Sequence, residues 1–173
     1  MVVGTSGAGK TTFARRLAER LHVSHIELDA LYWEPNWVPR APAAFRGLVS
    51  EAIAEDRWVL DGNYSAVREL VWARATSVIW LDYGLPRVVW QVLTRTLGRA
   101  LWRRELFSGN RESLRSAFLS RESILLWAIT SFQRRRRQYR ALFDARTFPH
   151  LRTIEFREPS EAEEFLRSLP PGP

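Results

Sequence analysis

The segment over residues 4–11 reads Gly-Thr-Ser-Gly-Ala-Gly-Lys-Thr, and its residue types suit the binding of a phosphate chain. Glycines let the backbone wrap closely around an anion and aim its N–H groups inward. A glycine, four residues and then Gly-Lys-Ser/Thr form the P-loop pattern, in which the lysine reaches the β- and γ-phosphates and the hydroxyl ligates Mg²⁺. We therefore expect ATP and Mg²⁺ as cofactors. The residues predicted to bind the nucleotide are Gly4, Ser6, Gly7, Ala8, Gly9, Lys10, Thr11 and Thr12.

The lysine of this segment is distinctive, because Lys10 is the only lysine among 26 basic residues and all the others are arginine. A compositional bias that favours arginine has left lysine only where a compact ammonium on a flexible stem is needed between phosphates. The formal net charge of +7 also favours polyanionic partners, which could be nucleotides, nucleic acid or anionic lipid.

Three aspartates follow short apolar stretches that read as strands. A P-loop enzyme needs an acid beside the metal, at the end of a strand near the P-loop strand. Asp61 is the preferred partner of Thr11 at Mg²⁺, with Asp82 as the alternative, and either could instead cap a turn. Asp29 is a candidate for holding or deprotonating an acceptor hydroxyl, or else for capping the segment after it. The predicted catalytic set thus includes Lys10, Asp61 and Asp29.

The arginines form the second informative group. Arg95 and Arg99 are four residues apart on one predicted helix face, and others lie within or beside residues 105–119 and in the run 134–137. Converging arginines stabilise the negative charge that phosphoryl transfer spreads over the migrating group. We expect Arg95, Arg99 and one or two arginines from 111 to 137 to act in this way. At most two of four consecutive arginines can face one site, and the alternative for the rest is a solvated or nucleic-acid-binding face.

A loop rich in tryptophan and proline is expected over residues 31–40, where Trp33 and Trp37 flank Glu-Pro-Asn. Aromatic side chains near a nucleotide site can stack a base, but they also anchor loops, and both interpretations stay open. His25 is interpreted as a structural strand residue.

Alternating strands and helices predict an α/β fold with a mostly parallel sheet. Strands are expected near 2–3, 25–28, 58–60, 77–81 and 151–156, and helices over 10–21, 42–55, 66–73, 86–103, 121–142 and 160–169. The first strand looks clipped by the chain start. Ser160 and Glu163 have capping-box spacing. The chain is expected to be one domain over 1–173, with a lid insertion at about 105–119 and a disordered tail at 170–173.

The composition excludes some classes of protein. Cysteine is absent, which excludes disulfides and cysteine-ligated metals. No run reaches the roughly 18 uncharged apolar residues of a membrane helix, and no signal segment is recognised at the start. We therefore expect a cytoplasmic protein.

Taken together, several segments resemble the adenylate-kinase-like proteins called DNA topology modulation proteins. These segments are the P-loop, His-Ile-Glu-Leu-Asp-Ala-Leu-Tyr-Trp at 25–33, Pro-Asn-Trp at 35–37, Trp-Val-Leu-Asp-Gly-Asn-Tyr at 58–64 and the strand at 78–82 with the arginine-bearing helix after it. The resemblance extends to about residue 145. It implies the nucleoside-monophosphate-kinase fold, a P-loop three-layer sandwich whose five parallel strands are ordered 2-3-1-4-5, with an arginine-rich helical lid.

The resemblance also assigns residues. Asp61 matches the acid near the metal, and Lys10 and Thr11 match the nucleotide site. Two features depart from adenylate kinase itself: Asn-Tyr replaces Pro-Arg after Asp61 and Gly62, and tryptophans and Arg40 stand where an arginine would grip the phosphate of AMP.

The sequence thus predicts an ATP- and Mg²⁺-dependent P-loop kinase that moves the γ-phosphoryl group to a small acceptor. The alternatives are a nucleotide-dependent DNA-associated ATPase or regulator of DNA topology, which would use the arginines on DNA, and a nucleotide-binding protein without catalysis. The acceptor and the oligomeric state stay open.

Overall fold

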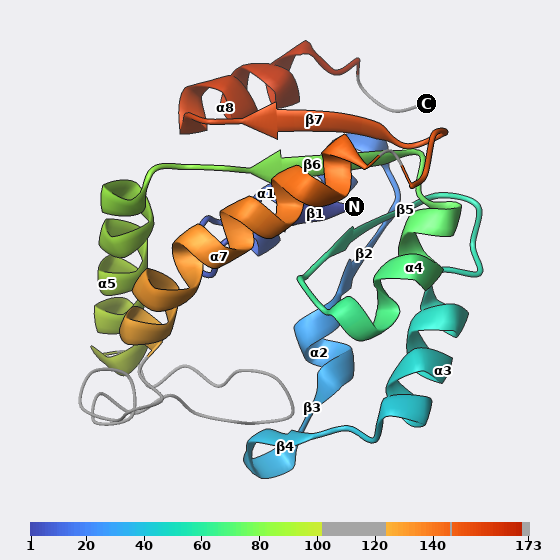
Figure 1. Ribbon diagram of the computed structural model, residues 1–173, viewed down its shortest axis with the longest axis horizontal. Helices are drawn as coiled ribbons and strands as arrows, with labels where there is room; N and C mark the ends of the chain where they lie inside the picture. The colour runs from blue at the N-terminus through green and yellow to red at the C-terminus, as the bar shows by residue number, and fades with distance from the viewer. Residues whose placement is uncertain (102–123, 146, 171–173) are drawn as a thin grey trace.

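The computed structural model describes residues 1–101, 124–145 and 147–170, and side chains are described outside 95–131 (Figure 1). The lid insertion predicted at 105–119 and residues 171–173 of the predicted tail lie outside the described residues. So do the first residues of the helix predicted from 121 and the last two of the helix predicted to end at 103.

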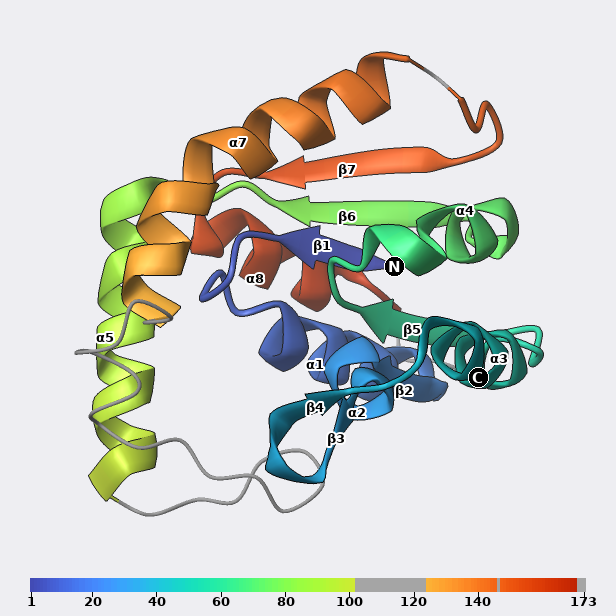
Figure 2. The ribbon, with the colours of Figure 1, turned by 60° about the horizontal axis from the view of Figure 1, so that its bottom comes forward.

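The centre of the molecule is a five-stranded parallel sheet (Figure 2). Its strands are β1 (Val2–Gly4), β2 (Ser24–Glu27), β5 (Trp58–Asp61), β6 (Ser77–Leu81) and β7 (Arg152–Phe156). Their spatial order is β2-β5-β1-β6-β7. The labels β3 (Trp33–Glu34) and β4 (Val38–Pro39) belong to a separate antiparallel pair, so the sheet's own strands run 2-3-1-4-5, as predicted.

Both faces of the sheet are covered, which explains why its central strands are apolar at consecutive positions. One face packs against α1 (Lys10–Leu21) and α8 (Pro159–Ser168), and its core includes Val59 and Ile79. The other packs against α3 (Pro42–Ala52), α4 (Ser65–Arg74) and the second half of α7 (Ile124–Asp144), and its core includes Leu60 and Trp80. The predicted three-layer α/β sandwich is confirmed.

The helix α5 (Leu85–Leu101) stands across the carboxyl ends of the strands (Figures 1 and 2). It packs directly on the loop between β1 and α1. Gly7 has a φ of 87°, and a Cβ built there would lie 2.3 Å from Cγ2 of Val92 on α5. Glycine is therefore required at this position both by the backbone conformation and by the close approach of α5.

The segment after β2 differs from the prediction. Leu28 begins a short helix, α2 (Leu28–Tyr32), instead of ending the strand, and the loop expected after it contains the β3–β4 pair joined by η1 (Pro35–Trp37). The segment therefore has regular structure of its own, beside the carboxyl end of β2 (Figure 1).

The last helix has a capping box, but its predicted position at Ser160 and Glu163 was wrong. The helix begins at Pro159 with Glu158 as its N-cap, and the Glu161 side chain accepts the backbone N–H of Glu158 at 3.2 Å. Proline suits the first helical position because its missing N–H has no partner there, and this moves the box two residues earlier than Ser160 and Glu163. Among the described residues, no helix combines the length and apolar character needed to cross a membrane.

Candidate functional site

The predicted phosphate-binding loop connects the end of β1 to the start of α1. Gly9 caps the helix in the left-handed conformation, with φ 85°. The carbonyl of Thr5 accepts two hydrogen bonds within the loop, one from the N–H of Ala8 at 3.0 Å and one from the ammonium of Lys10 at 3.3 Å. The amino end of α1 adds its N–H groups and its positive dipole end, a combination that binds anions. Ser6 is half-buried and Thr12 is exposed on the first turn of α1.

The hydroxyl of Thr11 lies between two carboxylates. It donates to Asp61 Oδ2 at 2.8 Å, and its distance to Glu27 Oε1 is 3.2 Å. The two acids are brought together by the sheet, since Glu27 and Asp61 are register partners at the ends of β2 and β5. On its other oxygen, Asp61 contacts Nε2 of His25 at 2.8 Å and is only 3% exposed. Asp61 is thus held on both oxygens beside the hydroxyl of the P-loop.

The electrostatics of this cluster suit a cation. Burial raises the pKa of the Glu27 carboxyl, and the nearby charge of Asp61 raises it further. A divalent cation would relieve that repulsion, and hard oxygen donors are what Mg²⁺ prefers. Among the described residues, no group of three or more His, Asp or Glu side chains is arranged to hold a metal alone. The residues therefore fit a Mg²⁺ ion completed by phosphate oxygens and water, which is the usual way this ion is bound beside a nucleotide.

The turn from Asp61 to Tyr64 ties this cluster to the rest of the site. Gly62 has a φ of 142°, and a Cβ there would lie 2.7 Å from Cβ of Leu28. Asn63 then clasps the first P-loop glycine: its Nδ2 donates to Gly4 O at 2.6 Å, and its Oδ1 accepts Gly4 N–H at 3.3 Å. The same Oδ1 accepts the hydroxyl of Tyr139 on α7 at 2.8 Å. The turn therefore links β5, the P-loop and α7.

The last residue of the turn reaches the third candidate aspartate. Tyr64 donates its hydroxyl to Asp29 Oδ1 at 2.5 Å. Asp29 lies in the first turn of α2, directly after β2. Burial raises the pKa of the Tyr64 hydroxyl, and the negative charge of Asp29 adds to the effect, so Tyr64 stays protonated and acts as the donor. The structure thus brings Asp29 to the same strand edge as Asp61.

Asp82, the alternative acid, has different partners. It is 5% exposed, and its Oδ2 accepts Arg136 Nε at 2.8 Å with Arg140 at 3.6 Å. Burial raises its pKa, while Arg136 opposes that effect. Of the two aspartates, Asp61 is the one that is hydrogen-bonded to Thr11, whereas Asp82 anchors α7 to the end of β6.

The arginines predicted to act on the transferred group are described only in part. Arg95 and Arg99 lie on α5, but their side chains fall outside the described residues, as do Arg111, Arg115 and Arg121 entirely. In the run 134–137, the side chains of 134 and 137 are exposed, whereas those of 135 and 136 are half-buried. Burial and two neighbouring positive charges lower the pKa of Arg135.

Sequence reasoning missed Glu27, Asn63 and Tyr64 as site residues and assigned His25 a purely structural role. One signal was available. Along β2 the polar His25 and Glu27 stand on either side of the buried Ile26, so both polar side chains share one face of the sheet. For Asn63, nothing in the local sequence indicates that its partner would be Gly4, 59 positions away.

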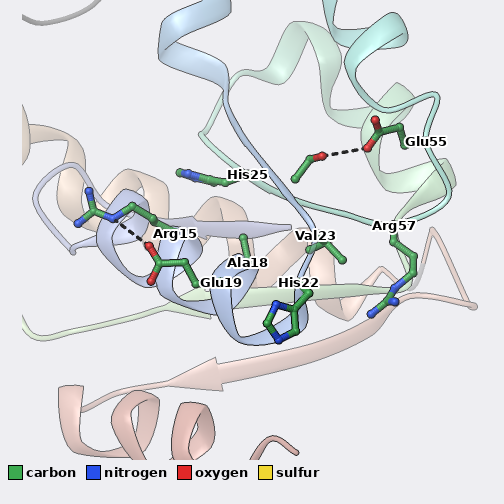
Figure 3. A pocket seen from close by; sticks show the side chains of 9 residues that line it. Arg15, Ala18, Glu19, His22, Val23, His25, Glu55 and Arg57 are labelled. Atoms are coloured by element: carbon green, nitrogen blue, oxygen red, sulfur yellow. Dashed lines mark hydrogen bonds and ion pairs between the residues drawn. The ribbon is translucent and has the colours of Figure 1, made fainter. Parts of the chain in front are cut away.

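A cavity of about 560 Å³ lies near the carboxyl end of α1 and along β2 (Figure 3). Four of its nine lining residues are arginine or glutamate, and the lining includes the pairs Arg15–Glu19 and Ser24–Glu55. His25 lies on its wall, but none of the P-loop residues 4–11 lines it. This cavity is therefore separate from the candidate phosphate site.

Comparison with known proteins agrees with this geometry. A family model described as "AAA domain" matches residues 1–164. No curated protein matches the chain significantly. The matched span contains the P-loop, all five strands of the sheet and both strand-end acids of the cluster. The chain therefore belongs to the AAA domain family, a P-loop nucleotide-binding family that includes ATPases and kinases.

Proposed function

We propose that the protein is an adenylate-kinase-like phosphotransferase, which uses ATP and Mg²⁺ to phosphorylate a small acceptor. The observation that carries this proposal is the turn 61–64. One end of the turn holds the P-loop hydroxyl through Asp61, and the other holds a second carboxylate, Asp29, through Tyr64. A protein that only bound a nucleotide would have no use for a second oriented carboxylate at this edge.

Each residue then has a role set by its chemistry. Lys10 and the loop amides bind the β- and γ-phosphates. Thr11 and Asp61 hold Mg²⁺, with Glu27 beside them, and His25 keeps Asp61 in place from the opposite side. The bound metal would neutralise charge that develops on the phosphate oxygens. Asp29 orients the acceptor hydroxyl and accepts its proton.

The transferred group needs further positive charge, because phosphoryl transfer depends on positioning and electrostatics. Arg95 and Arg99 are proposed for this role together with an arginine from 111 to 137. Among these, Arg135 lies four residues before Tyr139 and therefore on the same helix face as the residue that contacts Asn63. A cytoplasmic location, where ATP is abundant, is part of the same proposal.

The two strand-end aspartates give a matched test. We expect Asp61→Asn to lower kcat for ADP release about 100-fold or more, in line with the loss of one charge-stabilising group from a preorganised site. Asp82→Asn, also buried at a strand end, should lower it less than about tenfold. Lys10→Ala should abolish turnover while the circular dichroism spectrum stays native.

Full activity in Lys10→Ala would contradict the proposal. Equal losses in Asp61→Asn and Asp82→Asn would contradict the assignment of the metal-binding acid. Circular dichroism and denaturation midpoints for all three variants separate loss of chemistry from loss of fold.

A further inference from the structure

The acceptor side of the site is built around one oriented carboxylate. Asp29 accepts the Tyr64 hydroxyl at 2.5 Å, and that hydroxyl is also hydrogen-bonded to the Trp33 side chain. Since an indole is only a donor, Trp33 donates to Tyr64, which donates to Asp29. An ionised carboxylate has lone pairs for further donors. The arrangement suits a ligand that offers a hydroxyl group to Asp29.

A series of aromatic rings in contact with one another begins at Tyr64, the residue that binds this carboxylate. The ring of Tyr32 lies 4.5 Å from that of Tyr64 and 4.9 Å from that of Trp33, and Trp33 lies 5.6 Å from Trp37, all measured between ring centroids. Tyr32, Trp33, Trp37 and Tyr64 are each only half-buried. We call these four residues the aromatic wall. Half-buried rings beside a polar group can contact a flat apolar ring and still satisfy their own polar atoms.

The backbone of the wall is strained in one place. Trp37 has a φ of 57° and follows Asn36 at 62°, although a bulky side chain rarely adopts this left-handed region. The β3–β4 pair holds the two residues in this conformation, with Trp33 opposite Pro39 and Glu34 opposite Val38. Backbone strain of this kind concentrates at ligand sites. Here it sets the edge-to-face contact of Trp37 with Trp33.

The charges on this side disfavour an anionic ligand. Asp29 comes two residues after Glu27, whose register partner in the sheet is Asp61, so three carboxylates lie near this edge of the sheet. Arg40, which stands in the stretch where AMP would need a phosphate grip, is engaged elsewhere. Its Nη1 lies 3.0 Å from Glu34 Oε1, and its Nε donates to Leu31 O at 2.9 Å. Arg40 therefore braces the segment 31–40.

We infer that the acceptor is a neutral, hydroxyl-bearing small molecule with a flat ring and no phosphate group, such as an unphosphorylated nucleoside. This inference rests on the proposed kinase function and specifies its substrate class. The acceptor hydroxyl donates to Asp29 while its ring packs on the aromatic wall.

Phosphoryl transfer to this acceptor exchanges one P–O bond for another. The hydroxyl oxygen forms a bond to the γ-phosphorus of ATP as the bond from that phosphorus to the β,γ-bridging oxygen breaks. ADP leaves with the bridging oxygen. The hydroxyl proton passes to Asp29 and then to solvent, and the products are ADP, the phosphorylated acceptor and one proton.

The test compares matched acceptor pairs in an ADP-release assay at saturating ATP and Mg²⁺. The pairs are adenosine and AMP, cytidine and CMP, and thymidine and TMP. In at least one pair we expect kcat/KM for the nucleoside to exceed that for its monophosphate by about tenfold or more, because a phosphate would meet like charge near Asp29. Preference for the monophosphate in every active pair would overturn the inference and leave the kinase function standing.

Variants separate charge from packing. Asp29→Asn should lower the ratio of kcat/KM for the nucleoside to kcat/KM for its monophosphate, because it removes the charge that repels the phosphate at constant side-chain size. Tyr64→Phe keeps the aromatic ring and the charge of Asp29, so it should lower kcat but leave this ratio of kcat/KM values unchanged. Trp37→Leu should raise the KM for the acceptor. An unchanged ratio in Asp29→Asn would overturn the inference.

Two further outcomes are distinguishable. If no nucleoside releases ADP but a phosphorylated compound does, the acceptor class is wrong and the kinase proposal holds. If no acceptor of either class releases ADP from a protein that binds ATP, the proposed function itself fails, and the inference with it.

Discussion

Asn63 offers the sharpest test of how the site is assembled. Its side chain makes three hydrogen bonds: two to the backbone of Gly4, at 2.6 and 3.3 Å, and one from the hydroxyl of Tyr139, at 2.8 Å. Asn63→Ala removes all three, whereas Tyr139→Phe removes the last of them together with the hydrogen bond between the Tyr139 hydroxyl and Arg135. Comparing the two substitutions therefore separates the contributions of different hydrogen bonds at the junction between β5, the P-loop and α7.

The magnitudes follow from the contacts. A hydrogen bond contributes about 0.5–1.5 kcal/mol net, and the 3.3 Å bond lies near the long end of normal geometry. Asn63→Ala should thus lower the free energy of unfolding by about 2–3 kcal/mol. Tyr139→Phe should lower it by about 1 kcal/mol. Because the bond from Tyr139 is already lost in Asn63→Ala, the double variant should fall short of additivity by about the same 1 kcal/mol.

Urea denaturation with a constant m value measures these differences. ATP affinity, measured by calorimetry on the same proteins, should fall further in Asn63→Ala than in Tyr139→Phe, since only the former releases Gly4. Strict additivity of the two substitutions, or a smaller loss in Asn63→Ala than in Tyr139→Phe, would refute the proposed junction.

Two further predictions concern stability. Gly62→Ala should destabilise the fold by more than about 2 kcal/mol in the same urea assay, because its φ is 142° and its Cβ would lie 2.7 Å from Cβ of Leu28. Gly47→Ala on α3 is the matched control: a Cβ there meets nothing within 4 Å, and alanine should stabilise the helix by up to about 1 kcal/mol, so equal losses would contradict the steric explanation. Burial raises the pKa of Tyr139 to about 12 from an ordinary value of 10.0, so the unfolded chain loses this proton first and stability should fall between pH 10 and 12. Tyr139→Phe should make the pH-dependent decline shallower, and an unchanged slope would contradict that assignment.

Most of the fold could be predicted from short-range sequence patterns, such as the spacing of apolar residues. The helix over 10–21 was predicted with its observed bounds, because its start follows the P-loop and its apolar spacing is regular. The strands of the sheet could be predicted because a sheet that is buried on both faces needs apolar residues at consecutive positions. The short helix and strands of the α2–β4 segment could not be predicted, since proline, asparagine and tryptophan in series are typical of a loop.

The candidate site was predictable where a motif encodes it and not where distant segments meet. Lys10 and Thr11 follow from the spacing of the P-loop, and Asp61 follows from its place at a strand end. The clasp of Asn63 on Gly4 depends on the pairing of β1 with β5, which brings together residues 59 positions apart. The aromatic wall likewise depends on a turn after β5 that returns Tyr64 to α2.

Transfer of the γ-phosphoryl group to an acceptor can be followed directly with labelled ATP. The protein is incubated with ATP labelled at the γ-phosphate, Mg²⁺ and the panel of nucleosides, with and without DNA, and labelled products are separated. If the proposed transfer occurs, label appears on an acceptor, with little release as inorganic phosphate and no dependence on DNA. Label found only in inorganic phosphate, at a rate that is independent of every acceptor or is raised by DNA, would contradict it.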